Sequence, residues 1–117
     1  MSGLTTHVLD TSLGLPAHGV TIKLYKITDK GQSLIAETTT NHDGRTDKPL
    51  LTAEQITTGK YQLVFSMEDY FKKTQNNLAM PLFLSDIPIQ FGIADSTSHY
   101  HVPLLVSPFG FSTYRGS

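Results

Sequence analysis

The stretch His99–Ser117, HYHVPLLVSPFGFSTYRGS, decides the fold more clearly than any other part of the chain. Successive side chains of a β-strand point to opposite faces, so the first half of this stretch divides into two sets. The set that we expect in the core comprises Tyr100, Val102, Leu104 and Val106. The opposite face carries His99, His101, Pro103 and Leu105. Because this second face holds two imidazoles and little other polarity, it indicates a functional or covered surface rather than one left to bulk water.

The rest of this stretch predicts a turn followed by another strand. Ser107-Pro108 has turn-forming residues, and a short extended run then leads to the final Tyr114-Arg115-Gly116-Ser117. Chain ends usually fray, but this one carries an aromatic ring and a guanidinium with no polar tail behind them. We therefore expect this end of the chain to be held in place.

Short alternating segments separated by turn residues recur along the rest of the chain. The segments with the alternation of a strand are 5–10, 20–27, 33–40, 59–67 and 87–93. Turns are predicted at 14–16, 29–31 and 41–44, and the segment 48–58 is expected to be a loop. Only the segment 68–77, with acidic residues first and lysines later, suits a helix. This pattern predicts an all-β sandwich of seven to eight strands with one short helix.

The composition indicates a single domain over residues 1–117. The net charge is −1, from 9 basic and 10 acidic residues with no run of either sign, which argues against a nucleic-acid partner. The sequence has no cysteine, so disulfides and thiolate chemistry play no part. No apolar stretch approaches the roughly 18 residues of a membrane helix, and the first residues lack a secretory signal pattern. We expect a cytoplasmic protein, or a peroxisomal one if the source is eukaryotic, that binds no membrane.

The polar residues that could carry chemistry are far apart in the sequence. They are His7, Arg45, His99, His101, Tyr114 and Arg115. In a sandwich these residues could converge on one outer face of a sheet, although their spacing alone does not establish it. Metal binding by the two histidines of HxH, with His7 or His42 as a third ligand, is an alternative. A nearby arginine disfavours an added cation, so we expect no metal.

Five motifs resemble those of the 5-hydroxyisourate hydrolases of the transthyretin-like family. They are LTTHVLD at Leu4–Asp10, DGR at Asp43–Arg45, DYF at Asp69–Phe71, HYHVPLL at His99–Leu105 and YRGS at Tyr114–Ser117. The last motif is the most specific, because hormone-carrying transthyretins lack it. The resemblance covers essentially the whole chain. Phe111 and Val106 stand where many members have tyrosine and leucine, and the segment 78–88 matches the family less closely.

The resemblance implies two four-stranded sheets and one short helix, assembled as a homotetramer with sites at the dimer–dimer interface. It implies that His7, Arg45 and His101 are catalytic, and that His7, Arg45 and Tyr114 bind the substrate. The residues expected to support the site are His99, Arg115 and Ser117. No cofactor is implied.

The implied reaction is hydrolysis of the N1–C6 bond of 5-hydroxyisourate, which gives 2-oxo-4-hydroxy-4-carboxy-5-ureidoimidazoline in urate degradation. Histidines suit this reaction, because an ordinary pKa of about 6.5 lets them take a proton from water and return one to the departing nitrogen. Arg45 would hold the substrate and stabilise developing negative charge. The choice of general base among His7, His99 and His101 stays open. Two alternatives are a transthyretin-like carrier of a small ligand without catalysis and a metal-dependent hydrolase using His99 and His101.

Overall fold

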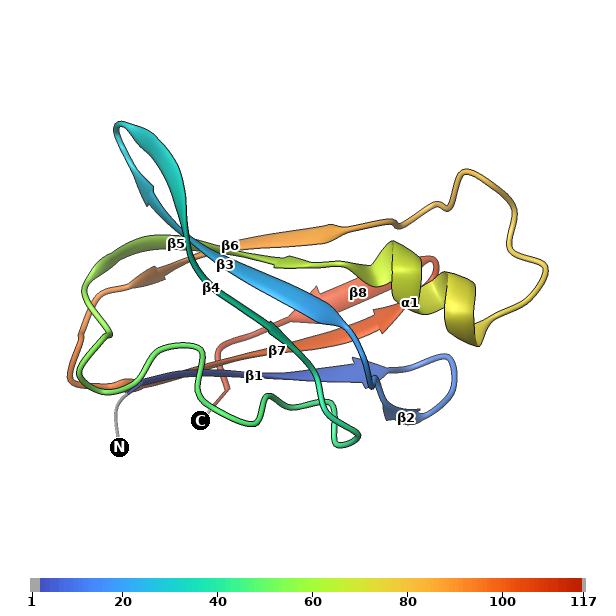
Figure 1. Ribbon diagram of the computed structural model, residues 1–117, viewed down its shortest axis with the longest axis horizontal. Coiled ribbons are helices and arrows are strands. Elements are labelled where there is room, and N and C mark those ends of the chain that lie inside the picture. Colours follow the sequence, from blue (N-terminus) through green and yellow to red (C-terminus); the bar gives the residue numbers. More distant parts are fainter. Residues whose placement is uncertain (1–2, 117) are drawn as a thin grey trace.

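The computed structural model describes residues 3–116, which form two β-sheets packed face to face with one short helix (Figure 1). The elements in chain order are β1 (Gly3–Asp10), β2 (Leu15–Pro16), β3 (Thr21–Thr28), β4 (Gly31–Thr39), β5 (Gly59–Phe65), α1 (Met67–Thr74), β6 (Ile87–Ile93), β7 (His99–Ser107) and β8 (Gly110–Thr113). One sheet has the strand order β2-β1-β7-β8 and the other has the order β4-β3-β5-β6. The predicted sandwich with a single short helix is therefore confirmed.

The two central strands of the first sheet come from opposite ends of the chain. Strand β1 pairs with β7 in parallel, whereas every other strand pair that the structure describes is antiparallel. A parallel pair needs a long crossover connection, and here the connection from β1 to β7 includes the whole of the second sheet. The ribbon shows β1 and β7 lying side by side with the same direction (Figure 1).

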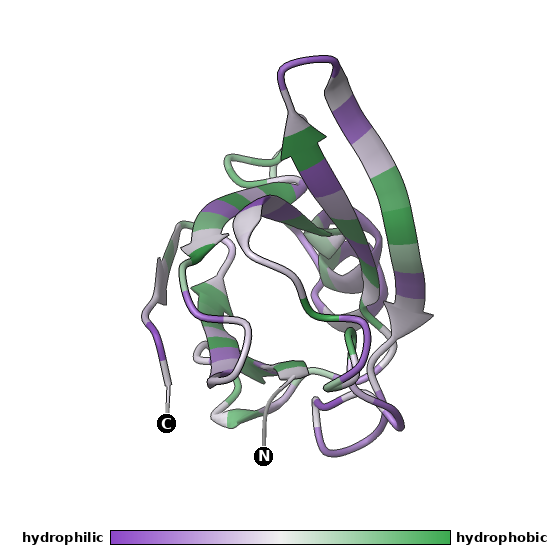
Figure 2. Ribbon diagram, turned by 90° about the vertical axis from the view of Figure 1, so that its left-hand side faces the viewer, coloured by the Kyte–Doolittle hydropathy of each residue, from purple (hydrophilic) through white to green (hydrophobic). Residues whose placement is uncertain are grey.

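The core lies between the inner faces of the two sheets. Hydrophobic and hydrophilic residues alternate along the strands when the sandwich is seen from its end (Figure 2), as expected for strands with one buried face. The inward set of β7 is buried as predicted and comprises Tyr100, Val102, Leu104 and Val106. Strand β1 contributes its own inward set, Leu4, Thr6, Val8 and Asp10. The opposite faces of β1 and β7 are thereby left to carry the polar residues.

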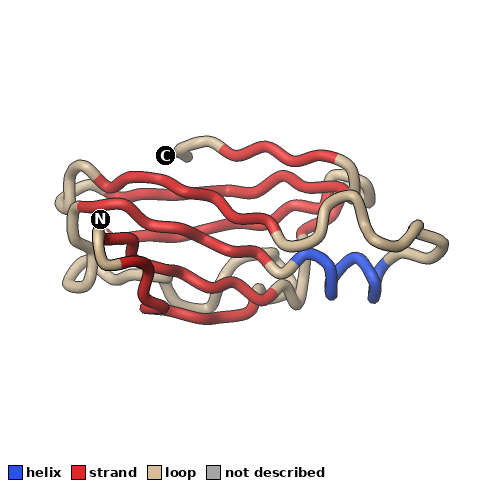
Figure 3. Tube along the Cα trace, turned by 90° about the horizontal axis from the view of Figure 1, so that it is seen from above, coloured by secondary structure: helices blue, strands red, loops and turns tan. Residues whose placement is uncertain are grey.

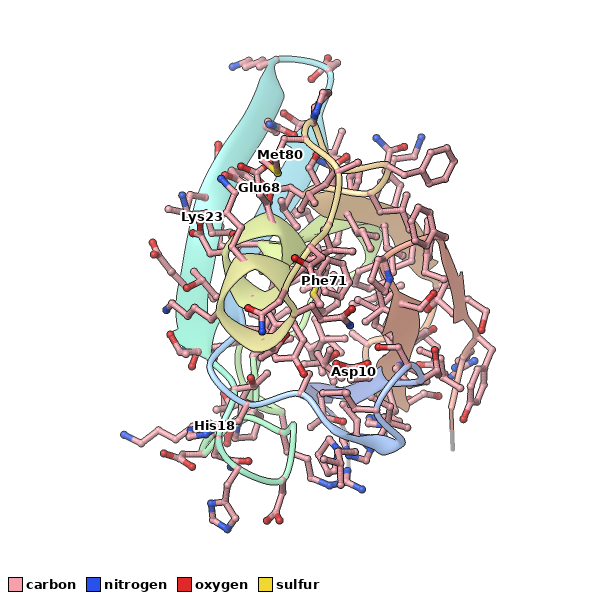
Figure 4. The ribbon with its side chains drawn as sticks, turned by 90° about the vertical axis from the view of Figure 1, so that its right-hand side faces the viewer. Asp10, His18, Lys23, Glu68, Phe71 and Met80 are labelled. Atoms are coloured by element: carbon pink, nitrogen blue, oxygen red, sulfur yellow. The ribbon has the colours of Figure 1, made fainter. Side chains whose placement is uncertain are left out.

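Helix α1 lies at one end of the sandwich, beside the ends of the strands (Figure 3). It directs Phe71 into the space between the sheets, and this side chain is fully buried (Figure 4). The helix begins at Met67 and ends at Thr74, whereas the sequence predicted residues 68–77. It ends early because Gln75 already has an extended backbone and Asn77 has a positive φ of 65°, which no helix continues through.

The buried carboxylate of Asp10 links helix α1 to β1 through a hydrogen bond. Asp10 is 1% exposed, and its Oδ2 accepts a hydrogen bond of 2.7 Å from the hydroxyl of Tyr70. Its Oδ1 accepts from the backbone and hydroxyl of Ser12 and from the backbone of Leu13, at 2.6–3.2 Å. Burial, and then the hydrogen bond to Asp10, raise the pKa of Tyr70, so the phenol stays protonated and donates. Asp10 thus joins the end of the first strand to the helix.

The remaining differences from the sequence predictions are at strand ends. The strand predicted for 59–67 stops at Phe65, because the chain turns into α1 there, and the predicted turn at 14–16 includes the two-residue strand β2. The segment 48–58 has no regular strand or helix, as expected. No helix within residues 3–116 is both long enough and apolar enough to cross a membrane.

Candidate active site

The parallel register of β1 and β7 gathers residues from both ends of the chain on one outer face. Thr5 pairs with His101, and His7 pairs with Pro103. His7, His99 and His101 are all partly buried on this face. Sequence spacing left open whether the HxH face meets His7, and the register places them on the same face.

The hydroxyl of Thr5 connects the two histidines of β7. Its Oγ1 lies 2.8 Å from Nδ1 of His101 and 3.1 Å from Nε2 of His99. Thr5 is not among the site residues that the sequence predicted. The signal was available, because Thr5 stands two positions before His7 and therefore shares its strand face.

A tight loop along the other side of β1 brings Arg45 to the histidines. Asn41 organises this loop: its side-chain oxygen accepts from the backbone of Asp43 at 2.9 Å and of Arg45 at 3.2 Å. The backbone N–H of Asn41 in turn donates to the carbonyl of Arg45 at 2.7 Å. The loop then forms an isolated β-bridge between Arg45 and His7. The turn predicted at 41–44 is present and leads directly into Arg45.

Gly44 allows this loop to approach the strand closely. Its φ is +75°, and a Cβ at this position would collide with the carbonyl oxygen of Val8. The same close approach gives a hydrogen bond of 2.7 Å from the backbone of Val8 to the carbonyl of Gly44. Only glycine combines this backbone angle with this contact, so the DGR motif sets the place of Arg45.

The ring of His7 is held by the loop as well as by the strand. Its Nε2 lies 2.9 Å from the carbonyl oxygen of Asp43. A carbonyl only accepts hydrogen bonds, so this nitrogen carries the proton in the neutral ring and Nδ1 keeps the lone pair. The Asp43 carbonyl is a second contributor that sequence analysis missed, since a backbone group has no sequence signal of its own.

The electrostatics of this face favour the neutral form of His7 and His101, because both pKa values are lowered. Burial lowers the pKa of His7 below its ordinary value, and the Arg45 guanidinium lowers it further against the opposing effect of Asp43. Burial also lowers the pKa of His101, with further contributions from Arg45, His7 and His99. Neutral imidazoles beside a fixed positive charge are suited to act as bases near an anion or a developing oxyanion.

A polar cleft of about 260 Å³ lies beside these groups. Its lining consists of Thr5, Thr6, Arg45, Thr46, Asp47, Lys48 and Pro49. The two cationic side chains in this lining suit a ligand with anionic or carbonyl oxygens. This cleft therefore offers space for a small substrate and has charged groups next to the histidines.

The end of the chain folds back onto β7, as the sequence predicted. The backbone N–H of Gly116 donates to the carbonyl of His101 at 2.7 Å, and a Cβ on Gly116 would lie 2.6 Å from Cδ2 of that imidazole. Arg115 stacks over the ring of Tyr100 at 4.0 Å and donates from Nη2 to the carbonyl of His99 at 3.2 Å. Arg115 and Gly116 of the YRGS motif thus pack directly against the HxH segment.

The two other predicted site residues are Tyr114 and Ser117. Tyr114 is 61% exposed and borders a second hollow of about 220 Å³, at the edge between the sheets, together with Phe91 and Arg115. Within residues 3–116 no hydrogen bond joins Tyr114 to the histidines, so its role in binding stays a prediction. Ser117 lies outside the described residues.

The structure separates His42 from the other histidines. Its side chain is 83% exposed, and its Nε2 faces Asp43 Oδ1 at 3.8 Å. Among the described residues, no three side chains of His, Cys, Asp or Glu come together as candidate metal ligands. The histidines on β1 and β7 are instead engaged by Thr5 and by the Asp43 carbonyl.

Comparison with known proteins identifies relatives of the whole chain and of its fold. A 5-hydroxyisourate hydrolase of Rhizobium meliloti (strain 1021), named 5-hydroxyisourate hydrolase 2, is 55% identical over 97% of this chain and 95% of its own length. The structure of Klebsiella pneumoniae 5-hydroxyisourate hydrolase superposes with a TM-score of 0.81 at 34% identity, over the full length of both chains. The crystal structure of (S)-allantoin synthase superposes with a TM-score of 0.92 at 42% identity, over 99% of this chain but only 44% of that longer chain. The sequence profile of the HIUase/Transthyretin family matches residues 4–116, and the chain belongs to that family.

Proposed function

We propose that this protein hydrolyses 5-hydroxyisourate at its N1–C6 bond, giving 2-oxo-4-hydroxy-4-carboxy-5-ureidoimidazoline as a step of urate degradation. The observation that carries the proposal is the arrangement of His7 and His101 beside the Arg45 guanidinium, with the pKa of both imidazoles lowered. Relatives named 5-hydroxyisourate hydrolase match over nearly the whole chain, which supports the same substrate.

The reaction adds water across an amide bond, so the site must accept a proton, stabilise an oxyanion and return a proton. A neutral imidazole takes a proton from water as the water oxygen attacks C6. The C6–N1 bond then breaks, and N1 receives a proton from the site. Positioned acid–base groups of this kind typically contribute about 10²–10⁴-fold to the rate.

Arg45 binds the substrate and stabilises negative charge, and it does not transfer a proton. Its guanidinium is permanently charged and planar, so it can bind two oxygens or nitrogens of the substrate at once. It also stabilises the negative charge that forms at the attacked carbonyl. Since the cleft beside it is lined by Thr5 and Lys48 as well, the substrate is proposed to lie there.

The proposal includes a metal-independent mechanism, a single domain and a homotetramer acting in the cytoplasm. The positive charge of Arg45 next to the imidazoles supports a reaction without an added cation. The partly buried histidine face supports assembly, because a second subunit over this face would exclude water from the site. In such an assembly Tyr114 would border the substrate from the neighbouring edge of the sandwich.

The direct test is a spectrophotometric assay with 5-hydroxyisourate generated in the cuvette from urate by a urate oxidase. The substrate decays without catalyst, and this background serves as the reference rate. Decay that accelerates in proportion to the added protein, with and without a chelator, would establish a metal-independent hydrolase. Decay at the background rate from correctly folded protein would refute the proposal and favour the carrier of a small ligand.

A further inference from the structure

Thr5 joins His99 and His101 in a chain of two hydrogen bonds, and a hydroxyl group limits how such a chain can be arranged. A threonine hydroxyl has one proton to donate, although its oxygen can accept twice. The two contacts of 2.8 and 3.1 Å therefore require that at least one ring nitrogen donates to Thr5. If one ring nitrogen accepts from Thr5, the other must therefore donate to it.

The other nitrogen of His99 selects between the two possible directions. Nδ1 of His99 is buried and has no hydrogen-bond partner within residues 3–116. A proton on this atom would be a buried N–H without an acceptor, which typically costs about 1–3 kcal/mol. A bare lone pair has a smaller cost, because orphaned buried N–H groups are the rarer defect in proteins. His99 therefore carries its proton on Nε2 and donates it to Thr5 Oγ1.

The direction of the whole chain follows from this first bond. Thr5 Oγ1 accepts from His99, and among residues 3–116 its only other side-chain partner is Nδ1 of His101, so the Thr5 proton points to that nitrogen. Nδ1 of His101 then accepts, and the proton of the neutral ring is on Nε2. We propose that Thr5 is a positioning residue that fixes His101 as the Nε2–H tautomer.

This tautomer gives the two candidate catalytic histidines different roles, which deepens the proposed function and depends on it. His7 donates from Nε2 to the Asp43 carbonyl, so its Nδ1 is the nitrogen that can take a proton. His101 presents an N–H and stabilises the oxyanion by donating a hydrogen bond. The protons then balance on His7 alone: Nδ1 takes one from the attacking water and passes it to N1 as the C6–N1 bond breaks.

The test compares Thr5→Val with Thr5→Ser. Valine has nearly the shape of threonine without the hydroxyl and favours strands, whereas serine keeps the hydroxyl. Each protein is labelled with ¹⁵N, and the shifts of both ring nitrogens of His101 are measured by NMR, with His101→Asn used to assign them. The rate with 5-hydroxyisourate is measured on the same samples, and thermal unfolding confirms the fold.

We expect His101 in the unmodified protein to have a protonated Nε2 and a bare Nδ1. Thr5→Ser should keep this tautomer, because it keeps the hydroxyl, and should have a higher kcat than Thr5→Val. Thr5→Val should show a mixture of tautomers and a kcat lower by about 10–100-fold, the scale found for partners that orient a histidine. Thr5 would then act through His101 rather than through packing.

Three results would overturn the assignment. The first is a protonated Nδ1 on His101 or His99 in the unmodified protein. The second is an unchanged His101 tautomer in Thr5→Val, whatever its rate. The third is an equal loss of rate in both variants. If the unmodified protein does not hydrolyse 5-hydroxyisourate, the proposed function fails, while the NMR result still decides the tautomer by itself.

Discussion

The sheet β4-β3-β5-β6 and the sheet β2-β1-β7-β8 share one core but differ in how they are built and in what they present outward. The sheet β4-β3-β5-β6 consists of antiparallel neighbours, and its outer face carries residues such as Lys23, paired in register with Glu37 and Val64. The sheet β2-β1-β7-β8 pairs β1 with β7 in parallel across more than ninety residues, and its outer face carries linked histidines. The comparison teaches that the long-range pairing serves the site, whereas the antiparallel sheet serves as the support.

The strongest test of this difference between the two sheets is to remove one polar group from the outer face of each sheet. Arg45→Ala, His7→Ala and His101→Ala should each lower kcat/KM by about 10²–10⁴-fold, because each removes an acid–base or charge-stabilising group. Lys23→Ala, on the supporting sheet, should leave the rate unchanged. Initial rates with fresh substrate measure both, and size-exclusion chromatography checks that assembly is retained. Near-normal rates for the three site variants would show that the outer face of β1 and β7 is not the site.

A smaller effect is expected from a methyl group placed against the site. Gly116→Ala should lower kcat by about 10–100-fold, because its Cβ would lie 2.6 Å from the His101 ring and would displace it. Gly110→Ala is the matched control, since a Cβ there meets nothing within 4 Å. Steady-state kinetics on both variants is the measurement. Equal rates for the two would mean that the chain end does not position His101.

The two sheets can also be compared by how much the loss of one tyrosine hydroxyl changes the free energy of unfolding. Tyr70→Phe should lower the free energy of unfolding by about 1–3 kcal/mol, because Oδ2 of the buried Asp10 loses its donor. Tyr25→Phe, on the supporting sheet, should change it by no more than about 0.5 kcal/mol, since the Tyr25 hydroxyl has no hydrogen bond within the described residues. Urea unfolding followed by circular dichroism measures both. A Tyr70→Phe protein as stable as the control would mean that Asp10 gains nothing from the phenol.

The smallest expected effect is on the titration of the histidines. A lowered pKa in the folded state means that the unfolded chain binds the proton more tightly, so stability should fall as pH drops below about 6.5 and the penalty is complete below the folded pKa. Arg45→Ala should raise the pKa of both His7 and His101 toward the ordinary value, although burial still lowers them. NMR titration of the ring protons measures this shift. Unchanged pKa values would place the guanidinium too far away to act on the imidazoles.

Local patterns predicted the strands well, because alternation is a property of neighbouring residues. The inward and outward sets of β7 and the loop at 48–58 were both correct. The boundary between β5 and α1 was less accurate, since Met67 suits the core equally well as the last strand residue or as the first helical one. The early end of the helix depends on a positive φ at Asn77, and composition alone does not specify that angle.

The candidate site was predictable only in part. His7, Arg45 and His101 came from motifs, and the structure brings them to one face. Their meeting requires a parallel pairing of β1 with β7, and strand periodicity says nothing about which strand is the partner. Thr5 shares the strand face of His7, but that signal alone did not single it out, because its two histidine partners on β7 are known only from the structure.

The parallel pair of β1 and β7 has a consequence for how the chain is made. During synthesis, residues 3–10 are made well before their central neighbour, residues 99–107. All four strands of the antiparallel sheet are also made before β7, since the last of them ends at residue 93. Strand β1 must wait with that edge unpaired, and such edges promote aggregation. The pairing of β1 with β7 therefore completes the candidate site and covers this unpaired edge in the same step.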